Sequence, residues 1–255
     1  MMRWRPRGAR HLARAVVPAL FAIAAAGKAI HAVGVLDHAV SQPTTRSWLV
    51  ALYALLQTGV ALAFAVFTVD RAVPRKSSRS PVAFLACAAA IAGVLAFEGP
   101  APSTPEGVLL AGELTAVASC VWLLVSVCFL GRCFGVLPEA RGLVTRGPYN
   151  VVRHPVYIGE IGACVGLAIA SPSLRNAAVL GVLAAAQAVR MGLEERALTQ
   201  AFPGYVDYAS RTPRLIPRLA LARTLLGSGR ARAHVETLTP GDPLQPALAN
   251  PHRRT

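Results

Sequence analysis

The sequence predicts an all-α integral membrane protein, a bundle of about four transmembrane helices followed by a C-terminal helical hairpin. Hydrophobic residues make up 54% of the 255 residues and charged residues only 15%, whereas soluble domains carry roughly 25% charged residues. The apolar residues come in blocks close to the roughly 20 helical residues that cross the hydrocarbon core of a bilayer. Arginines gather mainly between and beyond these blocks, as is typical of the loops that flank membrane spans.

Four apolar blocks predict the four spans, at residues 15–36, 48–69, 81–97 and 107–130. The third block is somewhat short for a span. The first follows an arginine-rich arm and has the opening of a signal peptide, but its run of about 22 residues is long for the apolar region of such a peptide. Because further spans follow, we expect a retained first helix.

Two shorter apolar runs predict the hairpin. They cover residues 156–170 and 174–190, and the sequence SPS between them is typical of a turn. After Arg190 the character changes, and the stretch MGLEERALTQAF predicts a separate short polar helix that ends near Pro203.

The chain is therefore expected to have three parts. Residues 1–130 contain the N-terminal transmembrane helices, and residues 131–218 contain the polar motifs together with the hairpin. Residues 219–255 are rich in Arg, Pro and Gly, a composition that predicts a disordered basic tail.

Loop charges predict the orientation of the spans. The loop at 70–80 carries three Arg and one Lys and the segment at 131–153 four Arg, whereas the loop at 98–106 carries two Glu and no base. By the positive-inside rule, this alternation places the N-terminus and the 131–153 segment in the cytoplasm. The net charge of +14 then favours attraction to anionic lipid. Nucleic acid is not expected as a partner, because basic and aromatic residues are not interleaved.

The cysteines do not indicate a metal site or a disulfide framework. There are five of them, none forms a CxxC pair, and at least four lie in or beside apolar blocks. Buried free thiols are therefore expected, and no metal site is predicted.

The segment GPYNVVRHPVYIGEIG, residues 147–162, places a polar cluster directly before an apolar run. Proline is tolerated in the first turn of a helix but not in its interior, so Pro155 predicts a helix start. His154 then lies at the N-terminal end of that helix, where free backbone N–H groups and the helix dipole favour an anion. The alternative is a basic interfacial turn that only starts a membrane helix.

A second polar cluster, RMGLEERAL, begins at Arg190, the expected membrane boundary. Arg190 and Glu194 are four residues apart and share a helix face. They could form a surface ion pair worth a few tenths of a kcal/mol, or they could face a polar cavity just inside the bilayer surface. Glu195 lies on a different face, where it could serve an amine or be solvated.

Two polar residues, Lys28 and His31, lie inside the first predicted span, three residues apart on one helix face. They could line a cavity for a headgroup or a substrate. The alternatives are packing against other spans, or extension of the Lys28 side chain toward the membrane surface.

The series LVTRGPYNVVRHPVYIG, hairpin, EERAL, FPGYVDY and RLIP resembles the isoprenylcysteine carboxyl methyltransferase family and its phospholipid N-methyltransferase relatives. The resemblance covers roughly residues 131–218 and rests on the combined RHPxYxG and EE elements. It implies an integral membrane enzyme that uses S-adenosyl-L-methionine, with a membrane helix bundle and a cytoplasmic cofactor-binding segment. Consistently, no GxGxxG motif follows a predicted strand.

The resemblance also implies roles for individual residues. Arg190 matches the family's substrate-side arginine and is the expected catalytic residue. A further polar cofactor contact of the family would fall near Phe134, where a phenylalanine is a departure, so no role is assigned there. The residues expected to bind the cofactor are Arg141, Gly142, Leu143, Val144, Tyr149, His154, Pro155, Val156, Tyr157 and Glu194.

Carboxyl O-methylation of a lipophilic, isoprenylcysteine-like acceptor is the expected reaction. A carboxylate is already ionised and Arg190 could hold it with two hydrogen bonds, whereas an amine must first lose a proton. The expected partners are a lipophilic small molecule, a lipid or a prenylated acceptor, together with membrane lipids. The alternatives are N-methylation of a phospholipid or other amine, an NADPH-dependent membrane reductase, and a non-catalytic scaffold or transporter.

Overall fold

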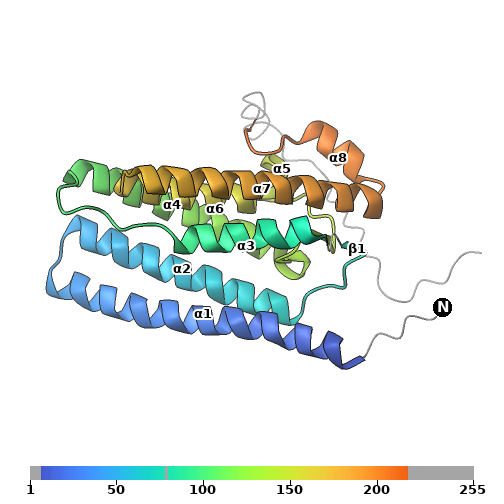
Figure 1. The fold of residues 1–255 in the computed structure, drawn as a ribbon, viewed down its shortest axis with the longest axis horizontal. Coiled ribbons are helices and arrows are strands. Elements are labelled where there is room, and N and C mark those ends of the chain that lie inside the picture. The colour runs from blue at the N-terminus through green and yellow to red at the C-terminus, as the bar shows by residue number, and fades with distance from the viewer. Residues whose placement is uncertain (1–6, 78–79, 218–255) are drawn as a thin grey trace, which may run out of the picture. The chain divides into compact units, whose positions relative to one another are not determined.

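The computed structural model describes residues 7–77 and 80–217, and the tail expected at 219–255 lies outside the described residues. The regular structure of the described part is almost entirely helical, with one two-residue antiparallel ladder (Figure 1). Its elements are α1 (Arg7–Ser41), α2 (Thr45–Val69), β1 (Lys76–Ser77), α3 (Pro81–Leu95), α4 (Glu106–Leu130), the 3-10 turn η1 (Gly131–Cys133), β2 (Glu139–Ala140), α5 (Pro148–Val151), α6 (Pro155–Ala170), α7 (Leu174–Ala201) and α8 (Tyr205–Arg211).

The prediction of an all-α membrane bundle with about four spans is confirmed. Within the described residues, α1, α2, α4 and α7 are long and apolar enough to cross a membrane, and they are the only helices that are. The predicted third span corresponds to α3, which has 15 residues and falls short, so α7 rather than α3 completes the four. Large apolar side chains on the outer helices are exposed, Ile30 to 76% for example, as expected of surfaces that face lipid.

One helix boundary was predicted wrongly. The hairpin arm was expected to end at Arg190 and a separate polar helix to follow, but α7 runs without interruption from Leu174 to Ala201. Residues after Arg190 are mostly strong helix formers and include no proline, so a change from apolar to polar side chains does not break the backbone. The helix ends at Phe202, which adopts an extended conformation before Pro203.

The helices pack in a chain of neighbours. α1 lies against α2, α2 against α4, α4 against α6, α6 against α7, and α7 against α3 (Figure 1). Small residues bring α4 and α6 close together: a Cβ on Gly166 would lie 2.5 Å from the backbone nitrogen of Ala116, and one on Gly159 would lie 2.6 Å from Cβ of Leu123. Such close backbone approach is the usual way in which helices associate inside membranes. It fixes the position of α6, whose first turn carries the polar motif.

Candidate active site

The polar motif starts α6 as predicted. Pro155 is the first residue of the helix and His154 is the residue that precedes it. The C-terminal segment lies against this start, because the backbone N–H groups of Arg153 and His154 donate hydrogen bonds to the carbonyl oxygens of Pro213 at 2.8 Å and Arg214 at 3.2 Å. The RLIP region is thus tied to the RHP motif by main-chain bonds.

A carboxylate on α7 holds the same turn from the other side. The Glu195 side chain is buried and lies 2.9 Å from Nη1 of Arg153, 3.1 Å from Nε2 of His154 and 3.0 Å from Nε of Arg214. The interpretation of Glu195 as a solvated side chain is therefore wrong, and a role of Glu195 toward an amine stays a prediction. The sequence predicted correctly that Glu195 does not share the face of Glu194, but only the folded chain brings Arg153, His154 and Arg214 to that second face.

The neighbouring Glu194 faces the cavity side of the same junction. The Tyr157 hydroxyl donates a hydrogen bond to Oε2 of Glu194 at 2.8 Å, and the His154 ring lies 5.5 Å from the Tyr157 ring. The start of α6 and the Arg190–Glu195 stretch of α7 therefore meet in space, although they are about 40 residues apart in the chain.

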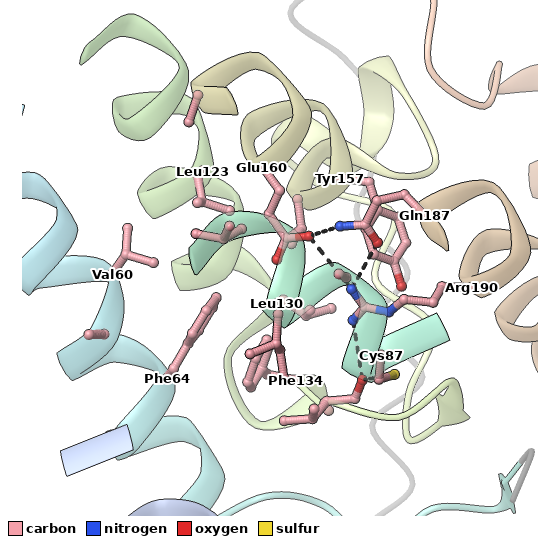
Figure 2. A pocket seen from close by; sticks show the side chains of 18 of the residues that line it. Val60, Phe64, Cys87, Leu123, Leu130, Phe134, Tyr157, Glu160, Gln187 and Arg190 are labelled. Atoms are coloured by element: carbon pink, nitrogen blue, oxygen red, sulfur yellow. Dashed lines mark hydrogen bonds and ion pairs between the residues drawn. The ribbon is translucent and has the colours of Figure 1, made fainter. Parts of the chain in front are cut away.

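Arg190 lies in the same cluster, but its partners are not the expected ones (Figure 2). The sequence suggested an ion pair with Glu194 one turn away. Instead Nη1 of Arg190 donates to Oε1 of Gln187 at 2.8 Å and lies 3.7 Å from Oε2 of Glu160, while Nη2 donates to the carbonyl of Val136 at 3.2 Å. The guanidinium also lies 5.0 Å above the Tyr157 ring. Its Nε is buried and has no hydrogen-bond partner among the described residues.

Sequence reasoning missed Glu160 and Gln187. The Gln187 amide donates to the Glu160 carboxylate, which links α6 and α7 inside the bundle. Both residues interrupt the apolar runs of the predicted hairpin, and polar residues within apolar membrane segments are functional candidates. That signal was present in the sequence for both residues and would have added them to the site.

These side chains line one cavity of about 380 Å³. Its polar end contains Glu160, Gln187 and Arg190, and Figure 2 shows Val60 and Phe64 of α2 across the open space from them. The predicted site residues that line the cavity are Tyr149, His154, Val156, Tyr157, Arg190 and Glu194.

The other predicted cofactor residues lie apart from the cavity lining. They are Arg141, Gly142, Leu143, Val144 and Pro155. The buried Arg141 side chain pairs with the carboxylate of Glu139 and donates to the carbonyl of Ala72, so it fixes the loop that carries β2 to the segment after α2. A role of residues 141–144 in cofactor binding stays a prediction. It would require that their backbone groups contact the cofactor or that their loop rearranges.

Tyr149 forms part of the cavity wall next to α6. Its backbone carbonyl accepts a hydrogen bond from the Tyr208 hydroxyl at 2.6 Å, so α8 holds α5 in place. Burial raises the pKa of the Tyr149 phenol well above its usual value, and the negative charge of Glu194 adds to this effect. The phenol therefore stays protonated and can donate a hydrogen bond into the cavity.

The departure at Phe134 has a clear structural consequence. Phe134 stacks on Phe64, with ring centroids 4.4 Å apart and planes 11° from parallel, and Phe21 approaches both rings edge-on. All three rings line the cavity. Where the family resemblance implies a polar contact, this chain has an aromatic wall contributed by three separate segments.

Comparison with known proteins finds a family match over the part of the chain that contains α4, α6 and α7. Residues 107–204 match the family model of phospholipid methyltransferases. The chain is 44% identical over 107 residues to the cobalt-zinc-cadmium resistance protein CzcN of Cupriavidus metallidurans, covering 39% of this chain and 48% of that protein. It is 40% identical over 87 residues to the nickel-cobalt-cadmium resistance protein NccN of Alcaligenes xylosoxydans xylosoxydans, covering 34% of this chain and 41% of that protein. The chain thus spans about half the length of the curated relatives that it matches.

Proposed function

Residues 107–204 carry a phospholipid methyltransferase family region, and on that premise we propose that the protein is a membrane methyltransferase that uses S-adenosyl-L-methionine. The acceptor is a lipophilic carboxylate, in the manner of an isoprenylcysteine, and the reaction is carboxyl O-methylation. The observation that carries this proposal is the Tyr157–Glu194 hydrogen bond beside Arg190, because it joins the two polar motifs on the wall of a largely apolar cavity.

The donor set around the polar end suits S-adenosyl-L-methionine, which when bound supplies a sulfonium methyl group for in-line displacement. Glu160 and Glu194 are carboxylates that can balance the sulfonium and ammonium charges, against one cation, Arg190, in their immediate cluster. The protonated Tyr149 phenol is a hydrogen-bond donor. His154 lies at the N-terminal end of α6, a place that favours the carboxylate of the cofactor.

Arg190 is the residue that would hold the acceptor. Its two terminal nitrogens are engaged by Gln187 and Val136, which orients the guanidinium, and its buried Nε has no partner in the described part of the chain. A buried donor without a partner costs about 1–3 kcal/mol, so an oxygen of a bound acceptor would relieve that cost. A carboxylate acceptor needs no general base, so holding the nucleophile at roughly 3–3.5 Å from the methyl group is the main task of the protein.

The apolar wall supplies the second requirement of the reaction. Phe21, Phe64 and Phe134 line the cavity and can hold the hydrocarbon part of an acceptor while excluding water. Exclusion of water strengthens the electrostatic contacts at the polar end. A water-soluble cofactor and a lipid-soluble acceptor can then meet in one place.

N-methylation of an amine is the second candidate, and Glu160 is the observation that favours it. Its carboxylate lies on the cavity wall close to Arg190, where it could take the proton that an amine must lose. A panel of prenylcysteine carboxylates and phospholipid amines, supplied with methyl-labelled cofactor to the purified protein in lipid nanodiscs, separates the two reactions. Label recovered as a base-labile ester supports O-methylation, and label stable to base supports N-methylation.

Cofactor identity is tested before the acceptor is known. S-adenosylhomocysteine should raise the melting temperature of the purified protein and NADPH should not, because only a ligand that binds the folded state stabilises it. Stabilisation by NADPH alone would favour a membrane reductase. If neither molecule binds at millimolar concentration, the methyltransferase proposal fails.

A further inference from the structure

A second polar pair lies on the cavity wall at the middle of two membrane spans. The Lys28 ammonium of α1 donates a hydrogen bond to the Gln57 side-chain carbonyl of α2, and both residues line the cavity. Lys28 lies 12 residues into the apolar span Val16–Ser41, and Gln57 lies 12 residues into α2, Thr45–Val69. At a rise of about 1.5 Å per residue, each is roughly 18 Å from the nearer end of its span, which is too far for a lysine side chain to reach the surface.

The Lys28 charge has no acidic partner in the described structure. None of the ion pairs found among residues 7–77 and 80–217 includes Lys28, whose hydrogen-bond partner is a neutral amide. His31, predicted to share its face, is exposed and does not line the cavity. A cation inside a membrane bundle is costly unless an opposite charge or water compensates it. Lys28 is therefore a candidate contact for a bound anion.

The two walls of the cavity differ in charge. The wall formed by α6 and α7 has two carboxylates, Glu160 and Glu194, and the cation Arg190. Arg153, just before α6, also lines the cavity, but its charge is paired with Glu195. Gln57 lies three and seven residues before Val60 and Phe64, so all three share one face of α2. Figure 2 shows Val60 and Phe64 across the cavity from Glu160 and Arg190. The wall of α1 and α2 thus offers the Lys28 cation and the Gln57 amide. The surface between the two walls is apolar and aromatic, with Val60 and Phe64 among its residues.

We propose that Lys28 and Gln57 form an anion subsite for the acceptor. The acceptor is then a two-ended amphiphile, with an apolar body, a methyl-accepting group at Arg190, and a second carboxylate or other oxygen anion held by the Lys28 ammonium and the Gln57 amide. This inference rests on the proposed function and narrows its acceptor from lipophilic carboxylates in general to those with a second anion, a class that does not include a plain isoprenylcysteine. A plain prenyl chain would offer Lys28 only hydrocarbon, whereas a remote anion would compensate its charge.

Binding of defined probes to the purified protein in nanodiscs tests the subsite without any turnover. The probes are an α,ω-dicarboxylic acid of medium chain length and the monocarboxylic acid of the same length, measured by calorimetric titration in the absence of cofactor. The wild type should bind the diacid about tenfold more tightly than the monoacid, since a charge-assisted hydrogen bond is worth at least that factor. Lys28→Met should remove this preference and leave monoacid binding unchanged.

Two variants control for damage to the fold. Lys28→Arg keeps the charge and should keep the preference for the diacid. His31→Gln, one turn away on the exposed face of α1, should behave as the wild type. Equal binding of both acids by the wild type would overturn the subsite. A parallel loss of both acids in Lys28→Met would also overturn it, because Lys28 would then hold the only anion of the ligand.

The outcome is separable from that of the proposed function. If S-adenosylhomocysteine fails to bind but the diacid preference and its dependence on Lys28 are found, the anion subsite stands and methyl transfer does not. If the cofactor binds and is turned over while Lys28→Met leaves the diacid preference intact, methyl transfer stands and the anion subsite does not.

Discussion

The Tyr157 hydroxyl and the Glu194 carboxylate are 2.8 Å apart. This hydrogen bond joins the first turn of α6 to the C-terminal half of α7, which is predicted to lie on the cytoplasmic side. Glu160 and Arg190 lie on the same two helices within the same cluster. The position of the candidate cofactor site therefore depends on the packing of one helix pair, and each contact in that pair can be varied separately.

Removal of the hydrogen bond should weaken cofactor binding. Tyr157→Phe keeps the ring under the Arg190 guanidinium but leaves Glu194 without its donor. We expect the affinity for S-adenosylhomocysteine to fall about tenfold, because a hydrogen bond to a charged group contributes about 1.5–3 kcal/mol. Calorimetric titration of Tyr157→Phe, Glu194→Gln and the double variant forms a cycle. Strictly additive losses would show that the two side chains do not act together.

Arg190→Lys should separate binding of the acceptor from binding of the cofactor. The lysine keeps the positive charge near Glu160 but cannot reproduce the bonds to Gln187 and Val136 that orient the guanidinium. We expect methyl transfer to a carboxylate acceptor to fall by about a hundredfold, in the range found when one oriented donor is lost from an active site. S-adenosylhomocysteine binding should change little. Unchanged turnover in a labelled-cofactor assay would remove Arg190 from the mechanism.

The adjacent glutamates should give opposite phenotypes. Glu195→Gln leaves Arg153, His154 and Arg214 without their shared carboxylate, so we expect a loss of about 2 kcal/mol in the free energy of unfolding. Glu194→Gln should lower cofactor affinity and leave the melting temperature of the unliganded protein almost unchanged. Thermal unfolding of both variants in the same nanodiscs compares them directly. Equal destabilisation by the two changes would contradict the division of roles.

Close packing of α4 and α6 should be indispensable. Gly166→Ala introduces a Cβ only 2.5 Å from the Ala116 nitrogen, and overpacking of this kind costs about 1–3 kcal/mol. Gly181→Ala in α7 is the matched control, because its Cβ would meet nothing within 4 Å. That change should be neutral or should stabilise the helix by up to about 1 kcal/mol. A melting temperature that is the same in both variants would mean that α6 can shift on α4 without cost.

The helical architecture was largely predictable because apolar block length and proline position are local properties. Pro155 started a helix as expected, and the spans at 48–69 and 107–130 correspond to α2 and α4 within a few residues. The break expected at Arg190 was wrong because a change in polarity was taken for a change in backbone structure. The residues after Arg190 are mostly helix formers, so α7 continues as one helix to Ala201.

The sequence alone predicted a bundle of apolar helices and singled out His154, Tyr157, Arg190 and Glu194 as candidate site residues. Only the tertiary structure decided which partner each of these side chains has. It paired Arg190 with Gln187 and Glu160, and Glu195 with two arginines and His154, because helix periodicity fixes the direction of a side chain but not the surface that it meets. It likewise brought Lys28 to the cavity and left His31 outside, a distinction set by the contact of α1 with α2.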